Sequence, residues 1–378
     1  MSYVDKVKIG DGPRVRFRAR WRDPSGRQKA KSFDTRKQAL DFLTKIDAAK
    51  LVGSYVDPAH GKVLIADQAR VWLAGRDVRP STLARDDSYF RSMILPHFGE
   101  VPIGQVRAAD VAAWKMELLG SKSPATVSKA LTLFKSMLND AVRDGLIPAN
   151  PIAGVKLPSI EREEMRFLAP EELLRLAEAI DPRYRALVFV GGYGGLRIGE
   201  LAGLRTSRID MLRGVIDIAE QVVEVGGKLS IGPLKTRAAR RRVRLPRFVV
   251  DELGTHLAKV HGELVFPSPD GGLLSRTRFR TRVWLPAISA AGLEGVRVHD
   301  LRHTAVSLWI ATGANPKEVA RRAGHTSVRT VFDVYGHLLP DADDALVDAL
   351  DSLGRRVLQE RAGTGRVLEL GNHIGGSQ

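Results

Sequence analysis

Near the start of the chain, polar and apolar residues alternate with a period of two. The apolar residues Val15, Phe17, Ala19 and Trp21 separate five arginines, Arg14, Arg16, Arg18, Arg20 and Arg22. Period two is the signature of a β-strand, so we expect the guanidiniums to line one face while the apolar side chains pack beneath. Turn-forming residues at 23–26 and a second strand over residues 28–33 follow.

The next segment predicts a helix over residues 35–51, with one side that can cover the sheet: Ala39, Phe42, Leu43 and Ile46. Residues 1–58 therefore predict a small α+β module, a three-stranded sheet plus a helix, with a bare arginine face. Charge that protects an edge strand is the plainer interpretation. Five arginines without an intervening acid exceed that need, and we favour a sheet that lies in a DNA groove.

After a break at residues 57–61, residues 62–157 carry only helical periodicity, with helices expected over about 64–73, 81–95 and 108–119. A fourth helix begins with Ser123 as N-cap and Pro124 at the first helical position. Its apolar residues form one core-facing stripe: Val127, Leu131, Phe134, Leu138 and Ala141. We expect an all-α domain of four helices.

The prolines Pro148, Pro151 and Pro158, followed by Glu161, Glu163 and Glu164, predict a second linker. Pro170, with acids at the next two positions, begins another helix. Helical patterns then surround a strand region over 215–245, which predicts a mixed, mainly helical domain over 163–355. Residues 356–378 have the composition of a flexible tail.

Composition narrows the function. The 378 residues include no cysteine, which excludes disulfides, cysteine-ligated metals and a thiol nucleophile. No stretch approaches the ~18 apolar residues of a membrane span, and the first ten residues lack a signal peptide's apolar core, so we expect a cytoplasmic protein. The net charge of +16 predicts a polyanionic partner, and residues 1–60, with 14 basic and 7 acidic side chains, hold nearly half of that surplus.

The first of four stretches with unusual side chains in the third domain is glycine-rich and covers residues 191–201. It lacks the Gly-Lys-Ser/Thr ending of a phosphate loop, so nucleotide binding is disfavoured. The glycines can instead let the backbone come close to a ligand, with Arg197 offering a planar fork to a phosphate oxygen. Glu200, three residues on, can hold that region in place.

Residues 233–246 suggest a hairpin that carries Lys235 and a run of arginines without an acid. A solvated basic loop is the alternative to a DNA contact through Arg237, Arg240, Arg241 and Arg242. A lysine amid such a cluster suits proton donation.

His299, Arg302 and His303 form the third stretch. Two histidines four apart could bind zinc, but the glutamate of the HExxH pattern and a third ligand are missing, so we expect no metal. His299 and Arg302 better suit clamping a phosphate, whereas His303 is expected to be a packed structural histidine.

The fourth stretch contains His325 in residues 323–327 and Tyr335 in residues 331–337. A capping-box pattern at Asn315 and Glu318 begins the helix before it. A lone tyrosine is usually a core residue, but His325 ten residues before it and His337 two after it raise the alternative of a reactive phenol.

The four stretches together resemble the tyrosine recombinase (phage integrase) family, in which G-L-R-x-x-E, a hairpin lysine, H-x-L-R-H, G-H-x-S and Y-x-H occur in this order. Each motif is weak singly, but the ordered set over about 140 residues is specific. The resemblance implies an arm-binding module at 1–58, a helical, SAM-like core-binding domain at 62–157 and a catalytic domain at 163–355, as in the larger phage and integrative-element integrases.

Carried over, the resemblance implies that Tyr335 attacks a DNA phosphodiester and leaves a 3′-phosphotyrosyl bond and a free 5′-hydroxyl. Arg197 and Arg302 would neutralise the nonbridging oxygens, and His299, His325 and the supporting Glu200 would assist. Lys235 would be the general acid, with Lys228 as the other candidate. No metal, ATP or other cofactor is implied.

The resemblance further implies double-stranded attachment-site DNA as substrate, a homotetramer, and a DNA-bending host protein and an excisionase as accessory partners. Residues after about Asp341 could dock on a neighbouring subunit. The alternatives are a DNA-binding protein that kept this fold without strand exchange, and a type IB topoisomerase, whose usual architecture fits the first module poorly.

Overall fold

The computed structural model describes residues 2–8, 15–53, 55–160, 165–338, 347–348 and 350–359. Two compact units make up the chain, residues 1–163 and residues 164–378. Several sequence-based expectations lie outside the described residues: Arg14, the linker acids Glu161, Glu163 and Glu164, Asp341, and residues 360–378. In the described part of the chain, no helix is long and apolar enough to cross a membrane.

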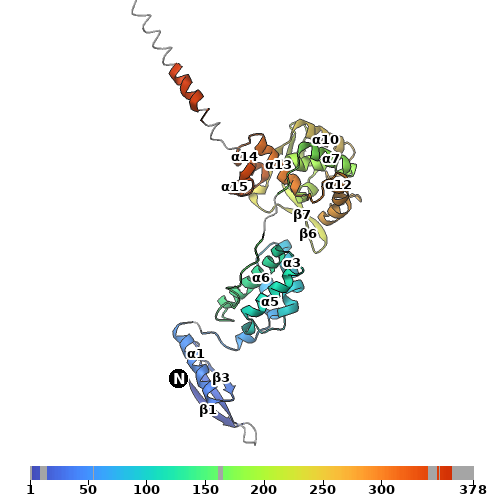
Figure 1. Ribbon diagram of the computed structural model, residues 1–378. Helices are drawn as coiled ribbons and strands as arrows, with labels where there is room; N and C mark the ends of the chain where they lie inside the picture. Colours follow the sequence, from blue (N-terminus) through green and yellow to red (C-terminus); the bar gives the residue numbers. More distant parts are fainter. Residues whose placement is uncertain are drawn as a thin grey trace, which may run out of the picture. The chain divides into compact units, whose positions relative to one another are not determined.

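The first module is an antiparallel sheet with one helix on it, drawn in blue in Figure 1. The sheet has the order β1 (Tyr3–Lys8), β2 (Val15–Arg22), β3 (Gln28–Phe33), and α1 (Arg36–Leu51) follows with Thr35 as N-cap. Ala19 and Trp21 pack against Ala39, Leu43 and Ile46. The alternation along β2 thus has the predicted effect, with apolar residues under the helix and arginines on the other face.

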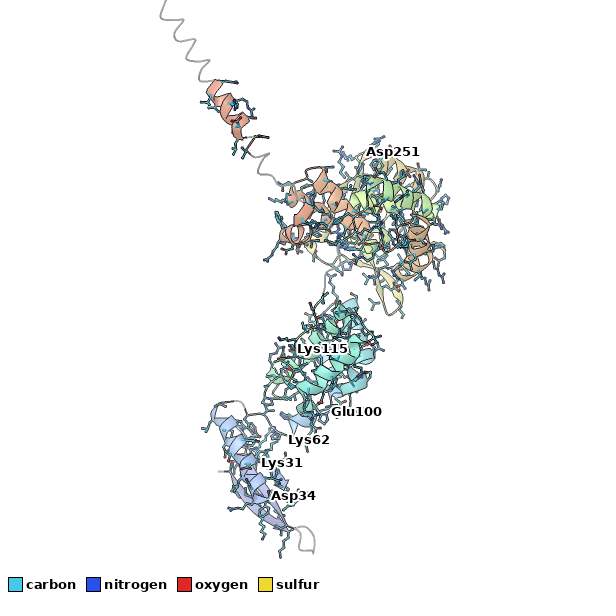
Figure 2. The ribbon with its side chains drawn as sticks, viewed as in Figure 1. Lys31, Asp34, Lys62, Glu100, Lys115 and Asp251 are labelled. Atoms are coloured by element: carbon cyan, nitrogen blue, oxygen red, sulfur yellow. The ribbon has the colours of Figure 1, made fainter. Side chains whose placement is uncertain are left out.

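The arginine face is not bare, which corrects the expectation from sequence. Arg16 pairs with Asp34 at 3.1 Å, and Arg20 pairs with Asp5 on β1 at 3.0 Å. Figure 2 labels Asp34 on this module. Asp5 reaches the arginine face because the β1–β2 register sets it opposite Arg18, next to Arg20. Within the described residues Arg18 and Arg22 have no acidic partner. The positive charge of this face therefore comes mainly from these two arginines, because Arg16 and Arg20 are paired with acids.

Residues 63–155 make up a helical region that packs around one core. It contains α2 (Ile65–Ala74), α3 (Pro80–Tyr89), the π-helical η2 (Phe90–Ile94), α4 (Leu95–Phe98), α5 (Ala108–Leu119) and α6 (Pro124–Arg143). Ser123 caps α6 as predicted, and the predicted stripe on α6 is buried. The helix expected over 81–95 extends to Phe98 through a π turn, which accommodates Pro96 because proline offers no N–H to the ladder.

The second unit packs helices around small sheets. Its helices are α7 (Pro170–Ala179), α8 (Arg185–Gly194), α9 (Ile198–Ala202), α10 (Arg247–Leu257), α11 (Arg276–Phe279), α12 (Leu285–Ala290), α13 (Asp300–Ala311), α14 (Pro316–Ala323) and α15 (Arg329–Tyr335). Its strands are β4 (Ile209–Asp210), β5 (Val215–Ile218), β6 (Glu220–Val225), β7 (Lys228–Pro233) and β8 (Arg241–Arg244). The fold class is therefore the expected multidomain one: an α+β module, an all-α domain and a mainly helical third domain.

The hairpin lies earlier in the sequence than expected. β6 pairs with β7 across Gly226 and Gly227, which both have positive φ, the conformation that a two-residue hairpin turn requires. β8 instead joins β5 in a separate sheet. Lys228 consequently stands next to the hairpin tip, and Lys235 lies in the segment that connects the two sheets.

The glycine-rich stretch packs helices together, a role that was not expected from the sequence. Gly191 and Gly192 are inside α8, where an added Cβ would meet Leu301 at 2.9 Å and Leu173 at 2.7 Å. Gly195 ends α8 with φ of 69°, and a Cβ there would come within 2.6 Å of Trp309. The absence of side chains brings α8 against α13, and so sets Arg197 beside Arg302.

Residues 350–359 are helical, so residues 356–359 do not belong to the flexible tail expected from the sequence. Leu350, Leu353 and Val357 recur at helical spacing along this segment and are all exposed.

Candidate active site

Glu200 holds two arginines together at the centre of the second unit. As the third residue of α9, its carboxylate accepts the backbone N–H of Arg197 at 2.9 Å and the Arg197 Nη1 at 2.8 Å. The same carboxylate accepts from Arg241 at 3.0 and 3.2 Å. Burial would raise the pKa of Glu200, but Arg241 and Arg197 outweigh it and hold that pKa below its ordinary value. Glu200 is therefore ionised and fixes the Arg197 guanidinium.

Arg241 is buried, which corrects its expected role as a DNA contact. Only 6% of the residue is exposed, and it donates to the carbonyls of Ala239 and Arg322 as well as to Glu200. A guanidinium with these partners braces the site from within. Arg237, Arg240 and Arg242, by contrast, are exposed and remain predicted DNA contacts.

The Arg302 side chain is buried and already hydrogen-bonded within the protein. It is 2% exposed, and it donates Nη1 to the Gly195 carbonyl at 2.6 Å and Nη2 to the Ala323 carbonyl at the end of α14. Burial, with Arg197 and Arg241 nearby, lowers the pKa of Arg302 to about 9, so the guanidinium is still charged at neutral pH. Its position is set by the carboxyl ends of two helices, α8 and α14.

Both expected site histidines are neutral. Partial desolvation, then His303 and Arg302, lower the pKa of His299 to about 4. Burial, then Arg302, Arg197 and Arg241, lower the pKa of His325 to about 4. The buried Nδ1 of His325 has no hydrogen-bond partner among the described residues. A neutral imidazole beside several guanidiniums can donate or accept one hydrogen bond without adding charge.

One open pocket gathers several of the expected residues. Arg197, Glu200, Lys235 and His325 line it together with Thr326 and Thr330. The exposed Lys235 therefore faces the arginine and histidine, whereas Lys228 does not contribute to this pocket. No group of three or more His, Asp or Glu residues in the described ranges is arranged to hold a metal ion.

Tyr335 does not line that pocket. The residue ends α15, is 2% exposed, and belongs to a core cluster with Val306, Trp309 and Val331. Phe167 lies against it, with ring centroids 6.3 Å apart. Burial raises the pKa of Tyr335 to about 12, against the opposing effect of Arg302 and Arg197. The phenol is therefore protonated at neutral pH.

The partner of the Tyr335 hydroxyl is His303, the residue expected to be merely structural. Its Nδ1 lies 2.6 Å from the hydroxyl oxygen. The two residues are 32 positions apart, so nothing in the local sequence indicated the contact. The motif H-x-L-R-H did place His303 near the site, although it did not indicate Tyr335 as its partner. A helix sets His303 on the same face as His299, and the two rings meet edge to face at 4.8 Å.

We expect Glu200→Gln to lower the free energy of unfolding of the second unit by about 3–5 kcal/mol at pH 7, because it leaves Arg241 buried without its counter-ion. The folded pKa of Glu200 lies below the ordinary value, so its contribution is complete above about pH 4.5 and is lost as the pH falls through the folded pKa. Urea unfolding at pH 7 and at pH 3 to 4, followed by tryptophan fluorescence, measures both effects.

The control is Glu263→Gln, which removes the carboxylate from an exposed ion pair with Arg205 and should cost less than about 1 kcal/mol. Equal stability of the Glu200→Gln variant and the wild type at pH 7, or a difference that does not shrink in acid, would contradict the bracing role of Glu200.

Two stretches of the chain match known families. Residues 166–341 match the Phage integrase family, and residues 67–119 match the phage integrase N-terminal SAM-like domain. The chain is similar to the integrase of Mycobacterium phage L5, with 27% identity over 305 residues that cover 79% of this chain and 81% of the relative.

Two solved structures share the fold. The Tn1549 transposon integrase in complex with a circular intermediate DNA has a TM-score of 0.65 at 18% identity, over 76% of this chain and 98% of that one. A lambda integrase tetramer bound to a Holliday junction has a TM-score of 0.55 at 17% identity, over 86% of this chain and 93% of that one.

Proposed function

Because the chain belongs to the phage integrase family of tyrosine recombinases and is a site-specific DNA recombinase, we propose that Tyr335 is its nucleophile. The observation that carries this assignment is the convergence of Arg197, Lys235 and His325 on one pocket, together with the electrostatic effect of Arg197 and Arg302 on both His325 and Tyr335. Trapping a covalent protein–DNA adduct through Tyr335 tests it.

In the proposed reaction the Tyr335 oxygen attacks a phosphorus atom of one DNA strand, and the bond from phosphorus to the 5′-oxygen breaks. Arg197 and Arg302 balance the negative charge that builds on the nonbridging oxygens. Lys235 protonates the leaving 5′-oxygen, and its place in the pocket favours it over Lys228. His299 and His325 donate hydrogen bonds, and Glu200 holds Arg197.

The phosphotyrosyl bond keeps the free energy of the broken phosphodiester, so a 5′-hydroxyl from a second duplex can reseal the strand without ATP. Because reacting atoms must approach within about 3 to 3.5 Å and Tyr335 is 2% exposed, the hydroxyl has to become accessible when DNA binds. α15 follows directly on residues 323–328 near the pocket, so a shift of this short helix is the smallest change that exposes the phenol.

We further propose that residues 62–157 hold the core site and that the exposed Arg237, Arg240 and Arg242 contact DNA beside the pocket. The solved lambda integrase tetramer supports a homotetramer on two paired sites. The exposed stripe of Leu350, Leu353 and Val357 suits docking on a neighbouring subunit. The expected reactions are the integration and excision of a phage or mobile element in the cytoplasm. A DNA-bending host protein and an excisionase are the expected accessory partners.

The arginine face of residues 1–58 is proposed to bind arm-type DNA sites. We expect Arg18→Ala in the full chain to weaken arm-site binding and to reduce the slope of log affinity against log salt by about 1, because one phosphate contact is lost. Fluorescence anisotropy between roughly 50 and 200 mM salt measures the slope.

The matched control is Lys37→Ala, which removes an exposed charge from α1 on the opposite side of the sheet and should leave the slope unchanged. An unchanged slope for Arg18→Ala, or an equal loss for both variants, would rule out the arginine face as the contact surface.

A further inference from the structure

A hydrogen bond between His303 and Tyr335 has no role in the reaction as described so far. His303 lies in the first turn of α13, directly after Arg302, and Tyr335 is the last residue of α15. The Nδ1 atom and the phenol oxygen are 2.6 Å apart, a short distance for a hydrogen bond between a ring nitrogen and a hydroxyl. The contact therefore joins an imidazole directly to the atom proposed to attack phosphorus.

The groups around the pair set the protonation state of each partner. The groups near His303 are the Tyr335 phenol, His299 at the start of α13, and Asp300 and Arg302 within α13. Arg297, which precedes this helix, also acts on His303. Burial lowers the pKa of His303, Arg297 and Arg302 lower it further, and Asp300 does not offset them. The imidazole is thus neutral at pH 7. In the tautomer that carries its proton on Nε2, the Nδ1 lone pair accepts the hydrogen bond from the protonated phenol.

We propose that His303 is a catalytic residue of this recombinase, whose Nδ1 takes the Tyr335 hydroxyl proton as the phenol oxygen attacks phosphorus. The inference rests on the proposed function of Tyr335. The proton passes from oxygen to Nδ1, the oxygen–phosphorus bond forms, and the bond from phosphorus to the 5′-oxygen breaks as Lys235 protonates the leaving oxygen. During resealing the 5′-hydroxyl returns its proton to Lys235, and His303 returns the other to the tyrosine.

Geometry favours His303 over the other neutral imidazoles. His299 touches His303 edge to face. In the part of the chain that the structure describes, the Tyr335 hydroxyl makes its hydrogen bond with His303 and with neither His299 nor His325. Among the described residues no carboxylate makes a hydrogen bond with the Tyr335 hydroxyl. A phenol whose ionisation is opposed by burial gains most from an acceptor already in place, and general base catalysis typically contributes about 10²- to 10⁴-fold.

The test compares adduct formation by wild type, His303→Gln and His303→Ala on a nicked attachment-site duplex. Glutamine can share a hydrogen bond with the phenol but cannot accept its proton. We expect both variants to form the adduct about 10²- to 10⁴-fold more slowly, and the residual rate of His303→Gln to rise with pH as hydroxide replaces the imidazole. His261→Gln, at an exposed position after α10, is the matched control and should keep the wild-type rate.

A second substrate separates proton removal from proton donation. In a duplex whose leaving 5′-oxygen is replaced by sulfur, the thiolate leaves without an acid. This substrate should restore cleavage by Lys235→Ala and should not restore cleavage by His303→Gln. Circular dichroism and binding to an intact duplex confirm that the variants fold and bind.

Each remaining outcome counts against the inference in a distinct way. A wild-type rate for His303→Gln, with slow cleavage by His303→Ala, would reduce His303 to positioning the phenol. Faster cleavage by both variants would mean that the hydrogen bond only keeps Tyr335 closed. An adduct that persists in Tyr335→Phe would overturn the proposed nucleophile itself, which is separate from a failure of His303.

Discussion

Replacing Tyr335 by phenylalanine should abolish the covalent protein–DNA adduct, with an expected loss of at least about 10⁴-fold in the rate of strand cleavage. The substitution removes only the hydroxyl oxygen, and loss of a covalent nucleophile typically costs this much or more. Because the ring stays, the core cluster with Val306, Trp309 and Val331 is retained and the protein should fold normally.

The measurement uses a nicked duplex with the element's attachment site, from which the short cleaved fragment diffuses away and leaves the adduct trapped. Denaturing electrophoresis then separates protein-linked DNA from free DNA. Tyr184→Phe is the control, because Tyr184 is a buried tyrosine whose hydroxyl donates to the Pro267 carbonyl away from the site. An adduct of normal yield with Tyr335→Phe would mean that another residue attacks the DNA.

Replacing Arg197 by alanine is expected to lower the rate of adduct formation by about 10²- to 10³-fold, the usual loss when one preorganised donor to a developing oxyanion is removed. Arg197 is the better choice than Arg302 for this experiment. Arg302 also holds the carbonyls of Gly195 and Ala323, so its removal would mix lost catalysis with lost stability. Arg197 is half-buried, and its side chain donates to Glu200 at the edge of the pocket.

Single-turnover cleavage under saturating protein measures this loss separately from binding, which a gel shift on intact duplex follows. The affinity should change by less than about threefold, since one phosphate contact among many is removed. Arg213→Ala, which breaks an exposed pair with Asp210, controls for the loss of an arginine from the same unit. A similar decrease in both variants would show that net charge, not the Arg197 donor, sets the rate.

Elements with a local signal were predictable from the sequence. Ser123 followed by Pro124 marked the start of α6, and the period-two run marked β2, because capping and pleating depend on neighbours a few residues away. The order of the four motifs also identified Arg197, Lys235 and His325 as a set, and the structure brings these three residues to one pocket. Their catalytic roles remain predictions.

Contacts between distant residues were not predictable in this way. Arg241 looked like its exposed neighbours Arg240 and Arg242, yet β8 pairs with β5 and turns Arg241 inward, where it meets Glu200. The alternation along a strand shows that Arg241 lies on the opposite face from Arg240 and Arg242. Which of the two faces is buried depends on how the strand pairs and packs, and the local sequence does not show this. The same holds for His303, whose contact with Tyr335 depends on how α15 packs on α13.

The π turns are a further difference with a clear cause. One continuous helix was expected over 81–95, and the chain inserts η2 just before Pro96. The same arrangement occurs at the π-helical η7 (Arg280–Trp284), which precedes Pro286. In both places a wider turn accommodates the missing N–H, a requirement that hydrophobic periodicity does not reveal.

Arg302 is hydrogen-bonded to the carboxyl ends of two helices, so its side chain loses its conformational entropy during folding and not during DNA binding. A free arginine side chain carries about 2 kcal/mol of rotamer entropy. Here the carbonyls of Gly195 and Ala323 each accept an N–H, so the guanidinium is immobilised while the chain folds. DNA binding then spends none of its free energy on ordering this group, and the remaining N–H groups point from a rigid frame. The entropy cost of ordering this proposed phosphate contact is therefore part of the free energy of folding and not of DNA binding.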